Sequence, residues 1–319
     1  MLSDMRGFSN GAILETTGSG NDILEYAEKA VWNPNTRQFM FMGAPHYQPH
    51  RMVIYGADSN SWSIGPLADP CQATQTGCVS HSYDHNTVDP ATGTMYFRMV
   101  GSPLVYQLPQ GASSWTQLPP VPMSSNQCCG ALAWFPERSQ LVVFDGDWGI
   151  WGWSPASNSW RHLAETNGAD GTSLPKLPMA SYNNFAHYNP TYNAILFGGT
   201  SGGTNYMYKY SADGTFTRLK DAPIPVLVDN GSVGTVMAPD PVSGKFVVAA
   251  TGNLLYEYDL GSDTWTQKNA SSAPPIWGGG GSASNDVFEV VAAPISTYGV
   301  IMYVRYNLAN SQVYIYKYS

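Results

Sequence analysis

A proline turn recurs along this chain at intervals of roughly fifty residues, and each turn is followed by the same succession of apolar and aromatic runs. In one clear copy, Asp89-Pro90-Ala91-Thr92-Gly93 precedes an apolar run at 95–97, a Tyr-containing run at 104–106 and the pair Ser114-Trp115. The other copies begin at Asn33-Pro34, Pro136-Glu137, Asn189-Pro190, Asp240-Pro241 and Ser296-Thr297. A repeat of this length is one unit that cannot bury its own apolar faces, so consecutive copies must pack against one another.

Each copy has the pattern of a four-stranded antiparallel sheet. Asp-Pro-x-Thr-Gly forms a turn, because proline fixes φ and glycine accepts a positive φ. The apolar segment before the turn predicts an innermost strand, and the β-branched, Tyr-rich and Trp-led segments after it predict the second, third and outermost strands. The large rings that we expect to pack between neighbouring units are Trp62, Trp115, Trp160 and Trp265. Units of this kind pack around a circle, so the sequence predicts an all-β, six-bladed β-propeller.

The repeat makes the chain one domain, although 319 residues could hold two. The predicted blades occupy residues 26–65, 80–119, 127–164, 181–220, 231–268 and 285–319. The last copy stops at Tyr318-Ser319, directly after its third strand. We expect the closing segment 1–25, which holds a strand-like run at 11–16, to supply the missing outer strand, because the ring otherwise keeps an open edge. The alternative is a disordered tail.

Composition limits the partners of the chain. Charged residues make up 12% of it, the formal net charge is −8 and the pI is about 5.1, which argues against a nucleic acid partner. No apolar run approaches membrane-spanning length, and the first residues lack the basic and apolar regions of a signal peptide. Low charge with many Tyr, Trp, Asn and Ser suits neutral polyhydroxy ligands. We expect a monomer that binds a polysaccharide or oligosaccharide.

The four cysteines form two pairs in the sequence. Cys71 and Cys78 enclose a short loop that a disulfide could close, and we expect this bond. Cys128 and Cys129 are adjacent, so they form either a strained vicinal disulfide, which we expect, or two free thiols. An even number of cysteines with one loop pair favours an oxidising compartment, extracellular or periplasmic.

The fourth copy resembles the Kelch group of propellers. It has the apolar run and double glycine Ile195-Leu196-Phe197-Gly198-Gly199, followed by Tyr208, Tyr210 and Phe216. Other copies depart from that pattern, with Met42-Gly43, Asp145-Gly146 and Thr251-Gly252 in place of the glycine pair. The resemblance implies a Kelch-like fold. Kelch-type propellers include adaptors, carbohydrate-active lyases and copper radical oxidases, and the fold does not select among them.

Polar residues gather where the predicted inner strands begin, and the same strands become small and apolar toward the proline turns. The densest group is His81-Ser82-Tyr83-Asp84-His85-Asn86, and we expect Tyr83, Asp84 and His85 to form the functional centre. Loops of the neighbouring blades are expected to open on the same face. The substrate-binding residues expected around this centre are Glu28, His46, His50, Arg51, His81, Trp148, Asn183 and Asn184. His187 lies among apolar residues and is expected to be a core histidine.

The most concrete function is that of a polysaccharide lyase, which needs a base, an acid and a cation that neutralises the uronate. His85 as base, Tyr83 as acid and Arg98 or Arg51 as cation could supply these roles, and the Kelch resemblance implies a His, Tyr and Arg set. Arg98 is equally suited to be a structural partner of Asp84. A glycoside hydrolase would instead need two carboxylates about 5–9.5 Å apart, such as Asp84 with Glu28 or with Asp145.

Other functions stay open. A non-catalytic module that binds glycan or protein through the channel face fits the same residues. A copper radical oxidase lacks a motif match, and a sialidase lacks its Asp-box turns and arginines. No cofactor is predicted outright, although zinc or calcium could be held by histidines among His46, His50, His81 and His85.

Overall fold

The computed structural model describes residues 24, 27–43, 51–66, 81–123, 130–167, 172–179, 181, 184–226, 234–268, 276, 289–307 and 310–318. This part of the chain contains β-strands and a short 3-10 helix, η3 (Pro136–Arg138), and no α-helix. Within the same residues, no helical segment has the length and apolar character needed to cross a membrane. The run 11–16 that we expected to close the ring and the four cysteines lie outside the described residues.

The described strands form four four-stranded sheets, each built from strands consecutive in sequence, and one seven-stranded sheet that joins β1–β4 to β21–β23. The seven-stranded sheet contains β1 (Ala27–Asn33), β2 (Gln38–Gly43), β3 (Arg51–Gly56), β4 (Ser61–Ile64), β21 (Glu289–Ile295), β22 (Val300–Asn307) and β23 (Asn310–Tyr316). The next two sheets are β5 (Asn86–Val88), β6 (Met95–Arg98), β7 (Val105–Leu108), β8 (Thr116–Gln117) and β9 (Ala131–Phe135), β10 (Gln140–Asp145), β11 (Gly149–Ser154), β12 (Ser159–Ala164). The last two are β13 (Phe185–Asn189), β14 (Ala194–Ser201), β15 (Thr204–Ser211), β16 (Phe216–Arg218) and β17 (Thr235–Pro239), β18 (Phe246–Ala250), β19 (Leu254–Asp259), β20 (Thr264–Gln267).

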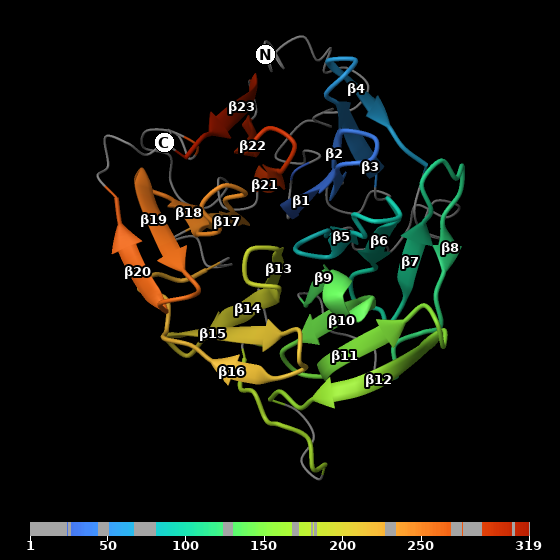
Figure 1. Cartoon of the computed structure of the whole chain (residues 1–319), viewed down its shortest axis with the longest axis vertical. Helices are drawn as coiled ribbons and strands as arrows, with labels where there is room; N and C mark the ends of the chain where they lie inside the picture. Colours follow the sequence, from blue (N-terminus) through green and yellow to red (C-terminus); the bar gives the residue numbers. More distant parts are fainter. Residues whose placement is uncertain are drawn as a thin grey trace.

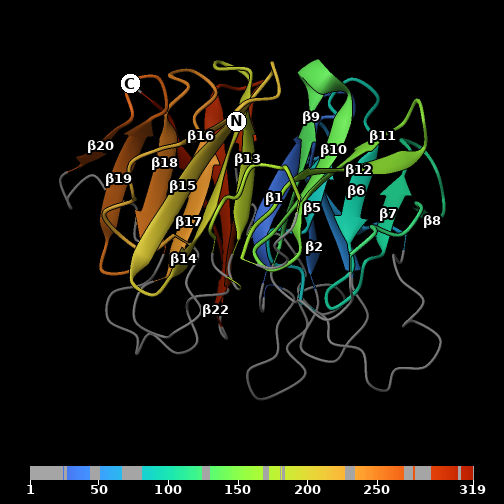
Figure 2. The same ribbon diagram turned by 90° about the horizontal axis from the view of Figure 1, so that it is seen from below.

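The sheets stand around a common axis, with the first strand of each group nearest the centre (Figure 1). Seen from the side, the sheets lie next to one another with their strands running roughly along the common axis (Figure 2). Inner strands of neighbouring groups run parallel: β1 pairs with β21, and isolated bridges join Ala27 to Tyr83 and Asp84 to Ala131. The starts of these inner strands therefore meet at one end of a central channel, which we call the polar end, and the proline turns lie at the other, the proline end.

The repeated proline turn is built as its sequence predicts. Asp89 Oδ1 accepts a hydrogen bond from the Ala91 amide at 3.0 Å, and Asp89 Oδ2 accepts one from the Thr92 hydroxyl at 2.7 Å. Gly93 has a φ of 72°, which explains the glycine at this position. An asparagine in the preceding group reaches across to the turn, because Asn33 Nδ2 donates to the Gly93 carbonyl at 3.4 Å.

The outer tryptophans join neighbouring sheets, as expected. Trp115 Nε1 donates to the carbonyl of Pro66 at 2.9 Å, and Trp160 Nε1 donates to that of Pro119 at 2.6 Å. Each acceptor follows the outermost strand of the preceding group. Trp115 also packs on an apolar cluster that includes Met40 from β2. These rings bury apolar area between sheets, where no single sheet could bury it alone.

Candidate functional site

Lys29, the third residue of β1, spans the channel and contacts three other sheets or their inner ends. Its side chain is buried, and its Nζ donates to the Asp84 carboxylate, to the Leu132 carbonyl at 2.6 Å and to the Ala186 carbonyl at 3.0 Å. Leu132 belongs to β9 and Ala186 to β13, while Asp84 lies just before β5. All three donors of the ammonium group are therefore used inside the protein.

Asp84 is wholly buried and is held from a second side as well. Its Oδ2 lies 3.4 Å from His187 Nε2 and accepts the Ala186 amide at 3.4 Å. Burial raises the pKa of Asp84 to about 7 despite the attraction of Lys29, and burial likewise lowers the pKa of Lys29. Burial, together with the Lys29 charge, lowers the pKa of His187 well below its usual 6.5. His187 is thus a buried histidine, as we expected, and Asp84 is its partner.

The polar end holds a contiguous group of rings just before β5. His81 Nδ1 lies 2.7 Å from the Tyr83 hydroxyl, and the Tyr83 ring centroid lies 5.7 Å from that of His85. Tyr83 has a φ of 31°, a left-handed conformation that is strained for a bulky side chain. His81 and Tyr83 are 9% and 6% exposed, whereas His85 is 0% exposed. Solvent therefore reaches the first two side chains and not the third.

Arg98 is the cross-strand neighbour of His85, because its amide donates to the His85 carbonyl at 2.9 Å. Its Nη2 donates to Asp145 Oδ2 at 2.9 Å, and both side chains are 1% exposed. The expectation that Arg98 pairs with Asp84 is wrong, because Lys29 occupies that carboxylate. Arg98 Nε and Nη1 have no acceptor among the described residues.

The carboxylates proposed for a glycoside hydrolase are engaged in other contacts. Asp84 and Asp145 each belong to a buried ion pair, with Lys29 and Arg98 respectively. Asp145 Oδ1 is also occupied, since it accepts the amides of Asp147 and Trp148 at 3.1 and 3.2 Å. Neither carboxylate is placed to protonate a glycosidic oxygen or to activate a water molecule.

The other expected substrate-binding residues that the structure describes do not lie together in one site. Glu28 is buried beside Lys29 on β1, and Arg51 opens β3 half-exposed. Asn184 is buried, and its Oδ1 accepts the Gly146 amide at 3.0 Å. Trp148 is half-buried in the turn between β10 and β11, where its carbonyl accepts from Trp151 Nε1 at 2.8 Å. The expected residues that lie outside the described part of the chain are His46, His50 and Asn183.

The described residues contain no group of three or more His, Cys, Asp or Glu side chains arranged to hold a metal ion. His81 and His85, the two described members of the expected zinc or calcium set, flank Tyr83.

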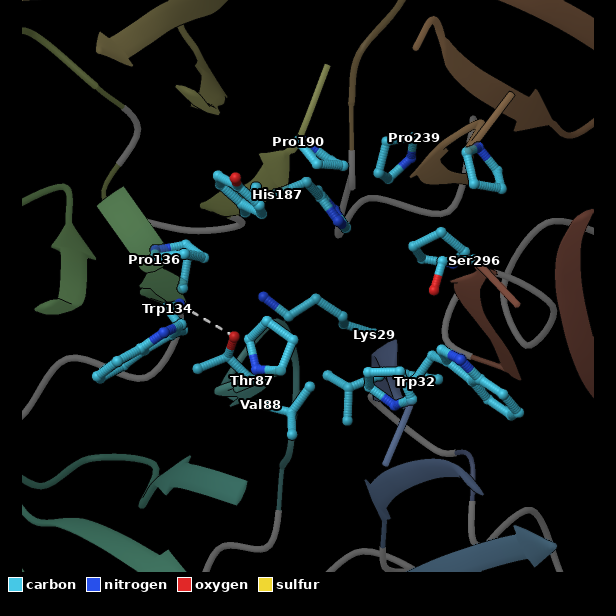
Figure 3. A pocket seen from close by; sticks show the side chains of 18 of the residues that line it. Lys29, Trp32, Thr87, Val88, Trp134, Pro136, His187, Pro190, Pro239 and Ser296 are labelled. Atoms are coloured by element: carbon cyan, nitrogen blue, oxygen red, sulfur yellow. Dashed lines mark hydrogen bonds between the residues drawn. The ribbon is translucent and has the colours of Figure 1, made fainter. Parts of the chain in front are cut away.

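A cavity of about 310 Å³ lies at the proline end of the channel, where no site was expected (Figure 3). The ends of the inner strands and the turns that follow them line it, with Lys29 and His187 at its centre. The prolines around it are Pro34, Pro90, Pro136, Pro190, Pro239, Pro241 and Pro294. Their repetition is visible in the sequence, but there it was explained by turn formation alone.

No protein-family model and no curated protein matches the chain. Among solved structures, a structural genomics protein of unknown function from Bacteroides thetaiotaomicron is similar, with 12% identity and a TM-score of 0.54 over 93% of this chain and 72% of that one. A nidogen/laminin complex matches with 9% identity and a TM-score of 0.51 over 77% of this chain and 79% of that one. TolB from Acinetobacter baumannii matches with 13% identity and a TM-score of 0.47 over 75% of this chain, which spans only 53% of the TolB chain.

Together with the arrangement of the sheets around one axis, the first two likenesses identify the fold as a β-propeller. They support no particular repeat family, so the Kelch resemblance stays a prediction from the sequence. At identities this low they show the fold and nothing of the function.

Proposed function

We propose that this β-propeller is a carbohydrate-active protein, most concretely a lyase that cleaves uronate-containing polysaccharides by β-elimination at the polar end. The observation that carries the proposal is the state of Tyr83. Its backbone is held in a strained left-handed conformation, and its hydroxyl lies 2.7 Å from His81 Nδ1. Strain at a bulky residue persists where the surroundings impose it, and such residues cluster at functional sites.

We assign the catalytic roles from the solvent exposure of each side chain. His85 is wholly buried beside the Tyr83 ring, so we assign it the positioning of Tyr83. We assign the proton transfer to His81 and Tyr83, which are buried but retain a small exposed area. His81 accepts the phenolic proton, and Tyr83 Oη then takes the proton beside the uronate carboxyl group. The electron pair forms the new double bond as the glycosidic C–O bond breaks, and Tyr83 returns a proton to the leaving oxygen.

The cation that the uronate needs is supplied by an arginine. Arg98 is 1% exposed and shares its charge with Asp145, whereas Arg51 is half-exposed at the start of β3. We therefore assign direct carboxylate contact to Arg51. Arg98, whose charge is compensated by Asp145, holds the backbone of His85 through its amide.

The test is Tyr83→Phe, which removes the hydroxyl and keeps the ring. We expect the wild-type protein to release unsaturated products from at least one member of a uronate polysaccharide panel, and the variant to be slower by a factor of about 100 or more. Tyr55→Phe is the matched control, because it also loses one hydrogen bond of 2.7 Å, to Asn60, at an outer turn. Similar melting temperatures for both variants with elimination lost only in Tyr83→Phe support the proposal. A Tyr83→Phe protein that cleaves at the wild-type rate contradicts it.

Non-catalytic glycan binding is the second candidate, favoured by the burial of His85 and by the neutralisation of Arg98 through Asp145. In that case the protein binds polysaccharides of the panel and cleaves none of them. Tyr83→Phe then weakens retention on a glycan array without any change in product absorbance.

We also propose that the ring has six blades and that the N-terminal segment completes the last one. The support is that the group β21–β23 has three described strands, while the other groups have four. Deletion of residues 1–20 is expected to lower the melting temperature strongly, because it opens a sheet edge. An unchanged melting temperature contradicts closure.

An extracellular or periplasmic location is part of the same proposal, and it rests on the cysteine pairing that the sequence predicts. Peptide mapping without reductant should recover Cys71 and Cys78 as one cross-linked species. Recovery of both as free thiols contradicts the location as well as the bond.

A further inference from the structure

The cavity at the proline end has an apolar floor, although a lysine forms it. Every donor of Lys29 Nζ is taken by Asp84, Leu132 or Ala186, so the ammonium group offers nothing to a ligand. The methylene stem of Lys29 crosses the centre of the cavity, and His187 points toward the same place from the opposite wall (Figure 3). The floor thus presents carbon atoms and one imidazole edge.

The walls are aromatic rings and prolines in fixed positions. Trp32 Nε1 donates to the Thr297 hydroxyl at 3.2 Å, and Trp134 stacks on Tyr96 with ring centroids 5.4 Å apart and an interplanar angle of 4°. Both tryptophans and Tyr188 line the cavity. A volume of about 310 Å³ falls at the lower end of the range for small-molecule sites. The cavity is therefore preformed, and a ligand need not order these side chains.

One carboxylate on the wall is unbalanced. Asp240 lines the cavity and is 1% exposed; its Oδ1 accepts the amides of Val242 and Ser243 at 3.1 and 2.6 Å, while its Oδ2 accepts no hydrogen bond from the described residues. The other charged group of the lining, Lys29, is compensated by Asp84. The lowered pKa of His187 keeps the imidazole uncharged near neutral pH. The described lining thus carries a net negative charge.

We propose that this cavity binds a small organic ammonium ion, such as a quaternary amine. An alkylated cation suits aromatic faces, because the ring quadrupole attracts it and its methyl groups tolerate an apolar wall. Asp240 supplies the counter-charge from within the wall, because its carboxylate is 1% exposed and acts on a bound cation through its field and not by direct contact. An anion would meet no uncompensated cation here, and a sugar would find few hydrogen-bonding groups. The site is independent of the proposed lyase site, which lies beyond Lys29 at the polar end.

The test compares two probes of the same shape, choline and its uncharged isostere 3,3-dimethyl-1-butanol, in calorimetric titrations of the full chain. Choline is expected to bind at least about tenfold more tightly, which corresponds to the usual strength of a desolvated cation–π contact. Asp240→Asn keeps the oxygen that accepts the turn amides and removes the charge. It is expected to abolish most of the difference between the two probes.

A second variant blocks the cavity without touching its floor. Ser296 is exposed at the rim with its side chain directed inward, so Ser296→Trp should fill the entrance and remove choline binding. Ala91→Trp is the matched control, since it adds the same bulk to an exposed position of another proline turn, outside the lining. Equal affinities for the two probes, no binding of choline, or choline binding that survives Ser296→Trp would each overturn the proposal.

Discussion

The two ends of the channel are made from the same inner strands, yet they differ in chemistry. At the polar end, where the strands begin, His81, Tyr83 and His85 form a chain of ring contacts. At the proline end, prolines from the strand ends and the turns line a largely apolar cavity. The difference shows that a repeated unit can supply both a polar and an apolar surface, because position along the strand decides which side chain faces the axis.

Lys29 and Asp84 separate the two ends. Their ion pair is buried. The Lys29 ammonium group also donates to backbone carbonyls of β9 and β13, which connects β1 to both strands. For both groups the loss of water outweighs the mutual attraction, as the directions of their pKa shifts show. We call this ion pair the partition, because it lies across the channel between the polar end and the proline end. Removing one partner is the harshest way to break the distinction between the ends.

Lys29→Met is expected to have the largest effect. It leaves the Asp84 carboxylate buried without its cation and two carbonyls without their donor, so the free energy of unfolding should fall by about 3–5 kcal/mol. Urea unfolding measures the loss. The double variant Lys29→Met with Asp84→Asn removes the isolated charge, so it should lose less than the single variant. A loss below about 1 kcal/mol in Lys29→Met would show that the pair does not hold the partition.

The next largest expected effect is the pH dependence of the free energy of unfolding. Asp84 and His187 affect it in opposite directions. Folded Asp84 titrates at about 7 and the unfolded carboxyl at 3.8, so between these values the folded state retains a proton and stability falls as pH rises. His187 has a folded pKa below 6.5, so its contribution rises as pH rises toward 6.5. The two contributions oppose each other in the wild-type protein.

Each single variant should expose the remaining group. Relative to wild type, His187→Gln should lose stability as pH is raised from about 4 to 6.5, and Asp84→Asn should gain it up to about 7, by on the order of a few kcal/mol. Urea titrations at half-unit pH steps give the two difference curves. Difference curves without slope, or with the same sign, contradict the assignment.

Gly130→Ala is a smaller test of the polar end. A Cβ at Gly130 would contact Arg98 Nη1 and approach the Phe144 carbonyl to 2.8 Å, a backbone atom that cannot turn away. The substitution should cost about 1–3 kcal/mol, because the surroundings must shift. A stability equal to wild type in thermal unfolding would mean that the space beside Arg98 is larger than the structure shows.

Asn189→Asp is the smallest test, at the proline end. Asn189 Nδ2 donates to the Gly244 carbonyl in the next turn at 2.7 Å, and its Oδ1 accepts the Thr191 amide at 3.0 Å. The acid keeps the acceptor and loses the donor, so a loss of about 0.5–1.5 kcal/mol is expected. The stability is read from urea unfolding at pH 7. An unchanged midpoint would show that contacts between turns do not support the cavity rim.

Local chemistry allowed much of the fold to be predicted. The proline turns, the apolar run after them and the outer tryptophans depend on neighbouring residues, and Asp89 with Gly93 and Trp115 with Pro66 have the contacts that this chemistry requires. The grouping of Tyr83, Asp84 and His85 at the start of an inner strand followed from the same alignment of repeats.

The partners across the channel could not be predicted, because they depend on distances between blades. Lys29 and Asp84 are 55 positions apart, and Arg98 and Asp145 are 47 apart. The signal in the sequence was the polar start of β1, where Glu28 and Lys29 precede the small residue Ala30. The cavity was missed because the prolines were explained by their turns, and the backbone turn does not reveal what its ring faces.

The most direct test of the distinction between the ends is a histidine NMR titration. The imidazole signals of the histidine-labelled protein are followed while a uronate oligosaccharide from the panel is added. His81, beside Tyr83 at the polar end, should shift on binding, and His187, beyond the partition, should keep its position. A His187 signal that moves while His81 stays unchanged would place the sugar at the proline end and contradict the account.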